Sequence, residues 1–146
     1  GQAIDLASVG QALTENQLRQ MHRLKTGALL RGSVMMGAAC REPAGTAHAA
    51  TEQALSRFGD AIGLAFQVVD DILDVTTDTA ILGKTAGKDA AADKPTYVSV
   101  LGLERSRDYV QELYAQAMAA LDASGLAAPS TRALRALAGV VVHRDK

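Results

Sequence analysis

Residues 63–75 read GLAFQVVDDILDV, an apolar stretch that carries three aspartates, Asp70, Asp71 and Asp74. The residues before the aspartates are apolar on most faces, and Gly59 and Gly63 would let a second helix approach closely, so we expect a buried helix. On a helix of about 3.6 residues per turn, Asp70 and Asp74 stack on one face and Asp71 lies about 100° around the axis. The pattern predicts three like charges crowded at the far end of a buried helix.

Carboxylates in such a setting need a counter-charge. An unpaired carboxylate is costly to move out of water, and crowding several of them raises their pKa values. The partial negative charge of a helix C-terminus disfavours aspartates there still further. We therefore expect cations to bind, and hard oxygen ligands with no His or Cys cluster nearby favour Mg²⁺. The alternative is an acidic helix end that is simply solvated.

The rest of the chain predicts an all-α fold. Its 146 residues fit one domain, and the apolar weight lies in Ala, Leu and Val, with only 3% aromatic residues. Thr14 and Gln17 form a capping-box pattern that opens a long helical run, whose second half should be deeply packed because it is nearly all apolar and small. Further helices are expected over about 47–75, 97–103, 104–124 and 131–143, with a possible short helix before Gly10.

Residues 76–95 have no clear period and read as a loop that leaves the aspartate motif. The loop carries Lys84 beside Gly83 and Lys94 before Pro95. Each lysine alone predicts a solvated charge, and Lys25, in the helical run, alone predicts a side chain that reaches out to water. Lysines beside a carboxylate cluster are what a magnesium diphosphate ligand requires, because carboxylates hold the metal and lysines neutralise the phosphate.

Gln67 lies one turn before the aspartates and is open to two interpretations. It could offer an uncharged oxygen to the site, or it could be a core glutamine bonded to a neighbouring helix. His22, His48 and His143 are scattered, and we expect them at the surface or at helix caps. The four methionines are at helical positions and predict core packing.

Composition excludes several classes of function. The net charge of −1 and the lack of a basic block argue against a nucleic-acid partner. The single cysteine, Cys40, allows no internal disulfide and fits a reducing cytoplasm. There is no run of apolar residues long enough to span a membrane, and no basic and apolar signal segment opens the sequence, so we expect neither a membrane span nor export. The chain opens without an initiator Met, so we expect a fragment of a longer protein.

Together these motifs resemble the C-terminal half of the trans-isoprenyl diphosphate synthases, the polyprenyl synthetase family, and its bacterial farnesyl type in particular. The resemblance covers essentially all of residues 1–146 as a C-terminal portion of one polyprenyl synthetase domain. It implies the isoprenoid synthase fold, with long helices around a central cavity, and usually a homodimer. The matching segments are GQAIDL (1–6), HRLKTGALLRGSVMMGA (22–38), GLAFQVVDDILDV (63–75), DTAILGKTAGKDAAADKPTY (78–97) and HRDK (143–146).

The resemblance also implies an activity. These enzymes condense an allylic diphosphate, dimethylallyl or geranyl, with isopentenyl diphosphate and release diphosphate, with Mg²⁺ held between two aspartate-rich motifs. Here the product would be farnesyl diphosphate. The alternatives are a geranylgeranyl or longer-chain synthase and a non-catalytic helical subunit.

Residue roles carried over from the family remain expectations. Asp70 would bind a magnesium directly, and Asp71 and Asp74 would act through metal-bound water. The Thr26 carbonyl and Gln67 would face the developing allylic cation. The family's first aspartate-rich motif has no counterpart in residues 1–146, so we expect these residues alone to be inactive or nearly so. The diphosphate would be held by Lys25, Lys84 and Lys94, with Gln2 and Asp5 lining the same cavity and Arg144 as a further candidate for closing it.

Overall fold

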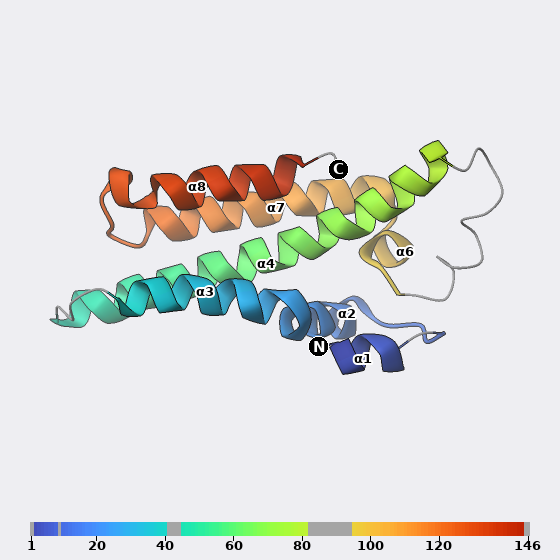
Figure 1. Cartoon of the computed structure of the whole chain (residues 1–146), viewed down its shortest axis with the longest axis horizontal. Coiled ribbons are helices and arrows are strands. Elements are labelled where there is room, and N and C mark those ends of the chain that lie inside the picture. Colours follow the sequence, from blue (N-terminus) through green and yellow to red (C-terminus); the bar gives the residue numbers. More distant parts are fainter. Residues whose placement is uncertain (1, 9, 41–44, 82–94, 145–146) are drawn as a thin grey trace.

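The computed structural model describes residues 2–8, 10–40, 45–81 and 95–144 (Figure 1). In these ranges the regular structure is helical and contains no strand, which confirms the all-α prediction. The elements are α1 (Gln2–Ala7), α2 (Glu15–His22), the π-helical turn η1 (Arg23–Gly27), α3 (Ala28–Ala39), α4 (Gly45–Ile81), α6 (Tyr97–Leu101), α7 (Leu103–Asp122) and α8 (Ala128–His143).

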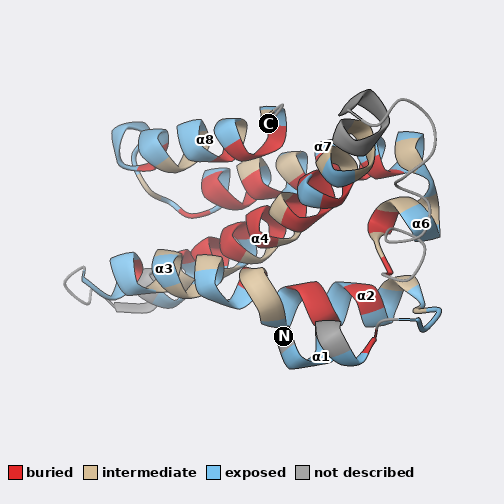
Figure 2. Ribbon diagram, turned by 45° about the vertical axis from the view of Figure 1, so that its right-hand side comes forward, coloured by how far each residue is buried: buried red, intermediate tan, exposed pale blue. Residues whose placement is uncertain are grey.

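Helix α4 is the axis of the molecule. It crosses the structure between the run formed by α2 and α3 and the pair formed by α7 and α8 (Figure 1). Buried residues follow α4 along most of its length, while much of α3 and α8 is exposed (Figure 2). One apolar cluster surrounds Val68 and Tyr97 near the aspartate motif, and a second surrounds Phe58 and Leu121 farther toward the start of α4.

Gly59 and Gly63 permit the close helix approach that the sequence predicts. A Cβ atom added to Gly63 would lie 2.7 Å from Gly27 Cα, and one added to Gly59 would lie 2.8 Å from Arg31 Cα. Real Cβ atoms are essentially never found so close to another heavy atom. These two positions therefore fix where η1 and α3 pack against α4.

Helix boundaries follow local chemistry. The Thr14 capping box is present, and a second one at Thr96 opens α6. Gly10, Gly102 and Gly125 have φ values of 75°, 83° and 69°, a region that glycine enters without a steric penalty, so the chain turns there.

The prediction of one long helical run is confirmed, since α2, η1 and α3 follow one another without a gap from Glu15 to Ala39, with a π-helical turn at Arg23–Gly27 inside the run. The prediction about the packing of its second half is wrong. The second half is not deeply packed, since Leu29 and Met36 are 70% and 66% exposed and only Ala38 of α3 is buried. The reason is that α3 contacts α4 along one face, and no described element covers its other face.

The prediction that the aspartate helix ends at about residue 75 is also wrong. Helix α4 continues to Ile81, so residues 76–81 of the expected loop are helical, and residues 82–94 lie outside the described residues. No glycine or proline stands between Val75 and Ile81, and the Thr76 hydroxyl donates to the Ile72 carbonyl 2.9 Å away, which is compatible with a continuing helix. The aspartates therefore lie within the helix and not at its C-terminus, and the helix-dipole argument does not apply to them.

No helix in the described ranges is long and apolar enough to cross a membrane.

Candidate functional site

Asp70 and Asp74 lie one turn apart on an exposed face of α4. The Asp70 side chain is 52% exposed and accepts a 2.5 Å hydrogen bond from Arg144 Nη2 at the end of the chain. Two carboxylates at this spacing are a suitable donor set for a hard cation such as Mg²⁺.

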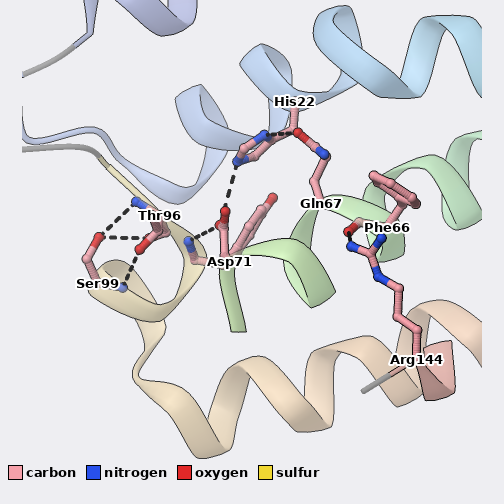
Figure 3. A network of polar contacts seen from close by, with 8 residues as sticks. His22, Phe66, Gln67, Asp71, Thr96, Ser99 and Arg144 are labelled. Atoms are coloured by element: carbon pink, nitrogen blue, oxygen red, sulfur yellow. Dashed lines mark hydrogen bonds and ion pairs between the residues drawn. The ribbon is translucent and has the colours of Figure 1, made fainter. Parts of the chain in front are cut away.

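Arg144 holds the end of the chain against α4. Its guanidinium lies 4.1 Å from the centroid of the Phe66 ring and donates to the Phe66 carbonyl at 3.3 Å (Figure 3). These contacts and the ion pair bring Arg144 to Asp70, the position at which the sequence predicts a metal.

Asp71 points away from the other two aspartates. Its side chain is 9% exposed, and its Oδ2 accepts a 2.7 Å hydrogen bond from the Tyr97 backbone N–H. His22 Nε2 lies 3.8 Å from the same oxygen (Figure 3). The expectation that three charges crowd one spot is therefore wrong, because the change of about 100° per residue turns Asp71 into the core. Within the described ranges, no group of three or more His, Cys, Asp or Glu side chains is placed to hold a metal ion.

His22 is the residue that the sequence interpretation missed. It was expected at the surface but is 3% exposed, with Nδ1 3.0 Å from Gln67 Oε1 and its ring stacked on Tyr97 at a centroid distance of 5.6 Å. The available signal was its position four residues after Leu18, which places it on the buried face of α2 beside Met21.

Gln67 has the core position that one of its two interpretations describes. It is 4% exposed and bonded to His22 of the neighbouring helix (Figure 3). The Gln67 amide thus positions His22, the residue just before η1. Gln67 lies on the same side of α4 as Asp71, one helical turn away.

Lys25 and Thr26 lie in the π-helical turn and are half-buried. Short π-helical segments are rare and occur often at functional sites. Asp60 of α4 faces this turn, with Oδ1 3.7 Å from Arg23 Nε and Oδ2 3.8 Å from Arg31 Nε.

Other predicted site residues lie outside what the structure describes. Lys84 and Lys94 fall in residues 82–94. Gln2 and Asp5 belong to α1, but only their backbone is described.

Tyr97 completes the buried part of the site. Its side chain is fully buried, and burial raises the pKa of its phenol well above the usual range, while the nearby Arg19 guanidinium offsets the effect only in part. Its hydroxyl makes no hydrogen bond of good geometry with the described residues. Tyr97 therefore acts in the core through its ring and its backbone N–H.

A groove of about 790 Å³ opens elsewhere, between α2, α4 and α7. Charged side chains such as Arg19, Arg57 and Glu112 line it, but none of the predicted site residues does. The site is thus defined by side-chain positions on α4 and η1 and not by this groove.

Comparison with known proteins identifies a family model and sequence relatives that match most or all of this chain. The polyprenyl synthetase family model matches residues 1–125. A probable farnesyl diphosphate synthase of Bradyrhizobium diazoefficiens is 54% identical over 113 residues, which cover 77% of this chain and 34% of the relative. The farnesyl diphosphate synthase of Escherichia coli is 42% identical over 146 residues, covering 100% of this chain and 48% of the relative.

Solved structures agree with the sequence relatives. A geranyltransferase of Helicobacter pylori, solved with magnesium and isoprenyl diphosphate, matches with a TM-score of 0.75 and 34% identity over 96% of this chain and 45% of the other. This chain thus spans between about a third and a half of the length of these three relatives. The match of the family model over most of the chain, together with the helical fold, shows that the chain belongs to the polyprenyl synthetase family.

Proposed function

We propose that residues 1–146 are the C-terminal portion of a prenyltransferase that makes farnesyl diphosphate. In this reaction the carbon–oxygen bond of an allylic diphosphate breaks, and diphosphate leaves with the bonding electrons. The double bond of isopentenyl diphosphate attacks the allylic carbon, and the new carbon–carbon bond is followed by loss of a proton. The departing diphosphate is the proposed base for that proton.

The observation that carries this proposal is the pair of exposed carboxylates, Asp70 and Asp74, in a chain whose family is established. Their oxygen atoms suit Mg²⁺, and the related Helicobacter pylori structure is described as a complex with magnesium and isoprenyl diphosphate. When bound, Mg²⁺ would stabilise the charge that develops on the leaving diphosphate.

The chain's own residues would bind the diphosphate and face the positive charge of the allylic group. Lys25, half-buried in η1, would bind a diphosphate oxygen, and the Thr26 carbonyl would face the positive charge that forms on the allylic carbon. Lys84 and Lys94 are further proposed diphosphate ligands, and Gln2 would line the same cavity. Gln67 would act from its core position, by holding His22 and hence the start of the turn that carries Lys25.

The longer parent protein is the proposed enzyme. Residues 1–146 span less than half the length of the Escherichia coli relative, so the missing length would have to supply a second metal-binding motif and the isopentenyl diphosphate site. We propose that the parent forms a homodimer in the cytoplasm, and that residues 1–146 alone are inactive or nearly so.

A longer product is the second candidate. The geranylgeranyl pyrophosphate synthase of Catharanthus roseus is 44% identical over 149 residues, covering 99% of this chain and 39% of the relative, against 42% for the Escherichia coli and 54% for the Bradyrhizobium diazoefficiens relative of the farnesyl type. The two activities differ in how many isopentenyl units are added and share the same chemistry.

Product analysis of the full-length parent tests the function. The parent is incubated with geranyl diphosphate, radiolabelled isopentenyl diphosphate and Mg²⁺, and the dephosphorylated products are separated by chain length. We expect farnesol as the main product and no incorporation when Mg²⁺ is chelated. Geranylgeraniol would favour the second candidate, and no incorporation with any allylic primer would contradict both.

A further inference from the structure

We propose that Asp71 is a positioning residue and not a metal ligand: together with His22 it fixes the π-helical turn that carries Lys25, and the start of α6, onto α4. The inference rests on the proposed function in one respect, the role of Lys25 in binding diphosphate. It separates Asp71 from Asp70 and Asp74, although all three belong to one motif.

The first step is the set of contacts around Asp71. Its Oδ2 accepts from the Tyr97 N–H at 2.7 Å and faces His22 Nε2 at 3.8 Å. The other ring nitrogen of His22 is 3.0 Å from Gln67 Oε1 (Figure 3). The carboxylate thus joins three elements, because Asp71 and Gln67 belong to α4, His22 ends α2 and Tyr97 begins α6.

The second step is burial. Asp71 is 7% exposed, His22 is 3% exposed and Tyr97 is fully buried. The His22 ring is stacked on the Tyr97 ring, which in turn lies 5.6 Å from the Tyr109 ring. If the Asp71 carboxylate turned out to a metal beside Asp70, the Tyr97 N–H would lose its acceptor within the core, and leaving a buried donor unpaired is unfavourable.

The third step concerns the turn itself. His22 immediately precedes η1, and Gly27 ends it. Gly27 packs so closely on α4 that a Cβ on Gly63 would lie 2.7 Å from its Cα. The turn is therefore fixed to α4 at both ends, by a polar contact at His22 and by backbone packing at Gly27, with Lys25 and Thr26 between them.

The consequence is a division of roles within the motif. The exposed face of α4 presents Asp70 and Asp74 to a cation. On the buried face, Asp71 holds the π-helical turn, and with it Lys25, at a fixed position relative to these two aspartates. Residues behind a site that orient its ligands commonly change activity without contacting the reacting atoms.

The test compares Asp71→Asn with Asp70→Asn in the full-length parent. Mn²⁺ binding is measured by the electron paramagnetic resonance signal of the free ion, and the KM for geranyl diphosphate is measured well below the melting temperature of each variant. We expect Asp70→Asn to weaken Mn²⁺ binding by about tenfold or more, and Asp71→Asn to change it by less than about twofold. We expect Asp71→Asn to raise the KM for geranyl diphosphate by about tenfold, because Lys25 is displaced.

Hydrogen exchange provides a readout that does not depend on activity. In Asp71→Asn, which removes the charge that faces His22 but keeps an oxygen that can accept from the Tyr97 N–H, amides of residues 23–27 should exchange faster, while those of α8 should be unchanged. Asp108→Asn, which removes the same charge from the exposed face of α7, is the matched control and should alter none of these properties. If Asp71→Asn does not fold, His22→Asn serves in its place, since it removes the ring nitrogen that faces Asp71, and the same shifts are expected.

Two results would overturn the inference. Loss of Mn²⁺ affinity in Asp71→Asn equal to that in Asp70→Asn would make Asp71 a metal ligand. A lower melting temperature with an unchanged KM and unchanged exchange at residues 23–27 would make Asp71 a purely structural residue. Failure of the proposed function would be seen separately, as absence of turnover in the wild-type parent.

Discussion

Asp70 and Asp71 are adjacent residues of the same type in opposite environments. The Asp70 side chain is 52% exposed and faces Arg144, whereas the Asp71 side chain is 9% exposed and faces His22. A rotation of about 100° about the helix axis is enough to separate a side chain that a cation can reach from one that the core encloses. The chemical type of a residue in this motif therefore does not define its role.

Arg144 should compete with a metal for Asp70. Arg144→Gln removes the guanidinium that pairs with Asp70, so we expect Mn²⁺ to bind the parent about two- to fivefold more tightly, the range for a partly exposed ion pair worth up to about 1 kcal/mol. Isothermal titration at low ionic strength would measure the change. Arg132→Gln removes an exposed charge from α8, the helix that ends just before Arg144, and serves as the control. Unchanged or weaker binding in Arg144→Gln would contradict the competition.

The sequence predicts which face of the helix these aspartates share better than it predicts the residues that surround them. Asp70 and Asp74 have the shared face that their spacing predicts. The partners of Asp71 could not be found in this way, because Tyr97 contributes a backbone N–H and His22 lies 45 residues before Gln67. Contacts of this kind depend on how the helices pack, which the periodicity of one helix does not specify.

At the scale of elements, the contact between η1 and α4 depends on Gly63. Gly63→Ala would place a Cβ 2.7 Å from Gly27 Cα, and since backbone atoms cannot yield as a flexible side chain does, we expect a loss of stability of about 1–3 kcal/mol. Gly37→Ala is the matched control, because a Cβ there meets nothing within 4 Å and alanine favours a helix by up to about 1 kcal/mol. Urea unfolding of both variants would measure the difference. Equal stability of the two would show that η1 is not packed tightly on α4.

Boundaries that depend on local chemistry were predictable, and those that depend on packing were not. The capping box at Thr14 and the turn at Gly10 are encoded within a few residues and agree with the sequence prediction. The π-helical turn has no comparable signal, since RLKTG contains ordinary helix-forming residues apart from Gly27. The prediction that α4 ends at residue 75 was wrong because it relied on polar composition, and residues 76–81 contain no glycine or proline that would end the helix.

At the scale of the whole molecule, α4 has buried faces that pack against other helices and one exposed face that carries the aspartates. Its buried faces organise the apolar clusters with α7, α6 and the end of α2, and its exposed face presents Asp70 and Asp74. The outer face of α3, with Leu29 and Met36, is not covered by any described element. This arrangement agrees with residues 1–146 being part of a larger helical protein, which we propose as the enzyme.

The turnover number of Asp70→Ala in the full-length parent tests the central claim, that this face of α4 holds the metal for prenyl transfer. Turnover is measured with saturating geranyl diphosphate, isopentenyl diphosphate and Mg²⁺, with Asp108→Ala as the control. The account predicts that Asp70→Ala lowers turnover by about a hundredfold or more, because charge on the leaving group is no longer stabilised, while the control is unaffected. A turnover number equal to that of the wild-type parent would contradict the assignment of the metal to Asp70.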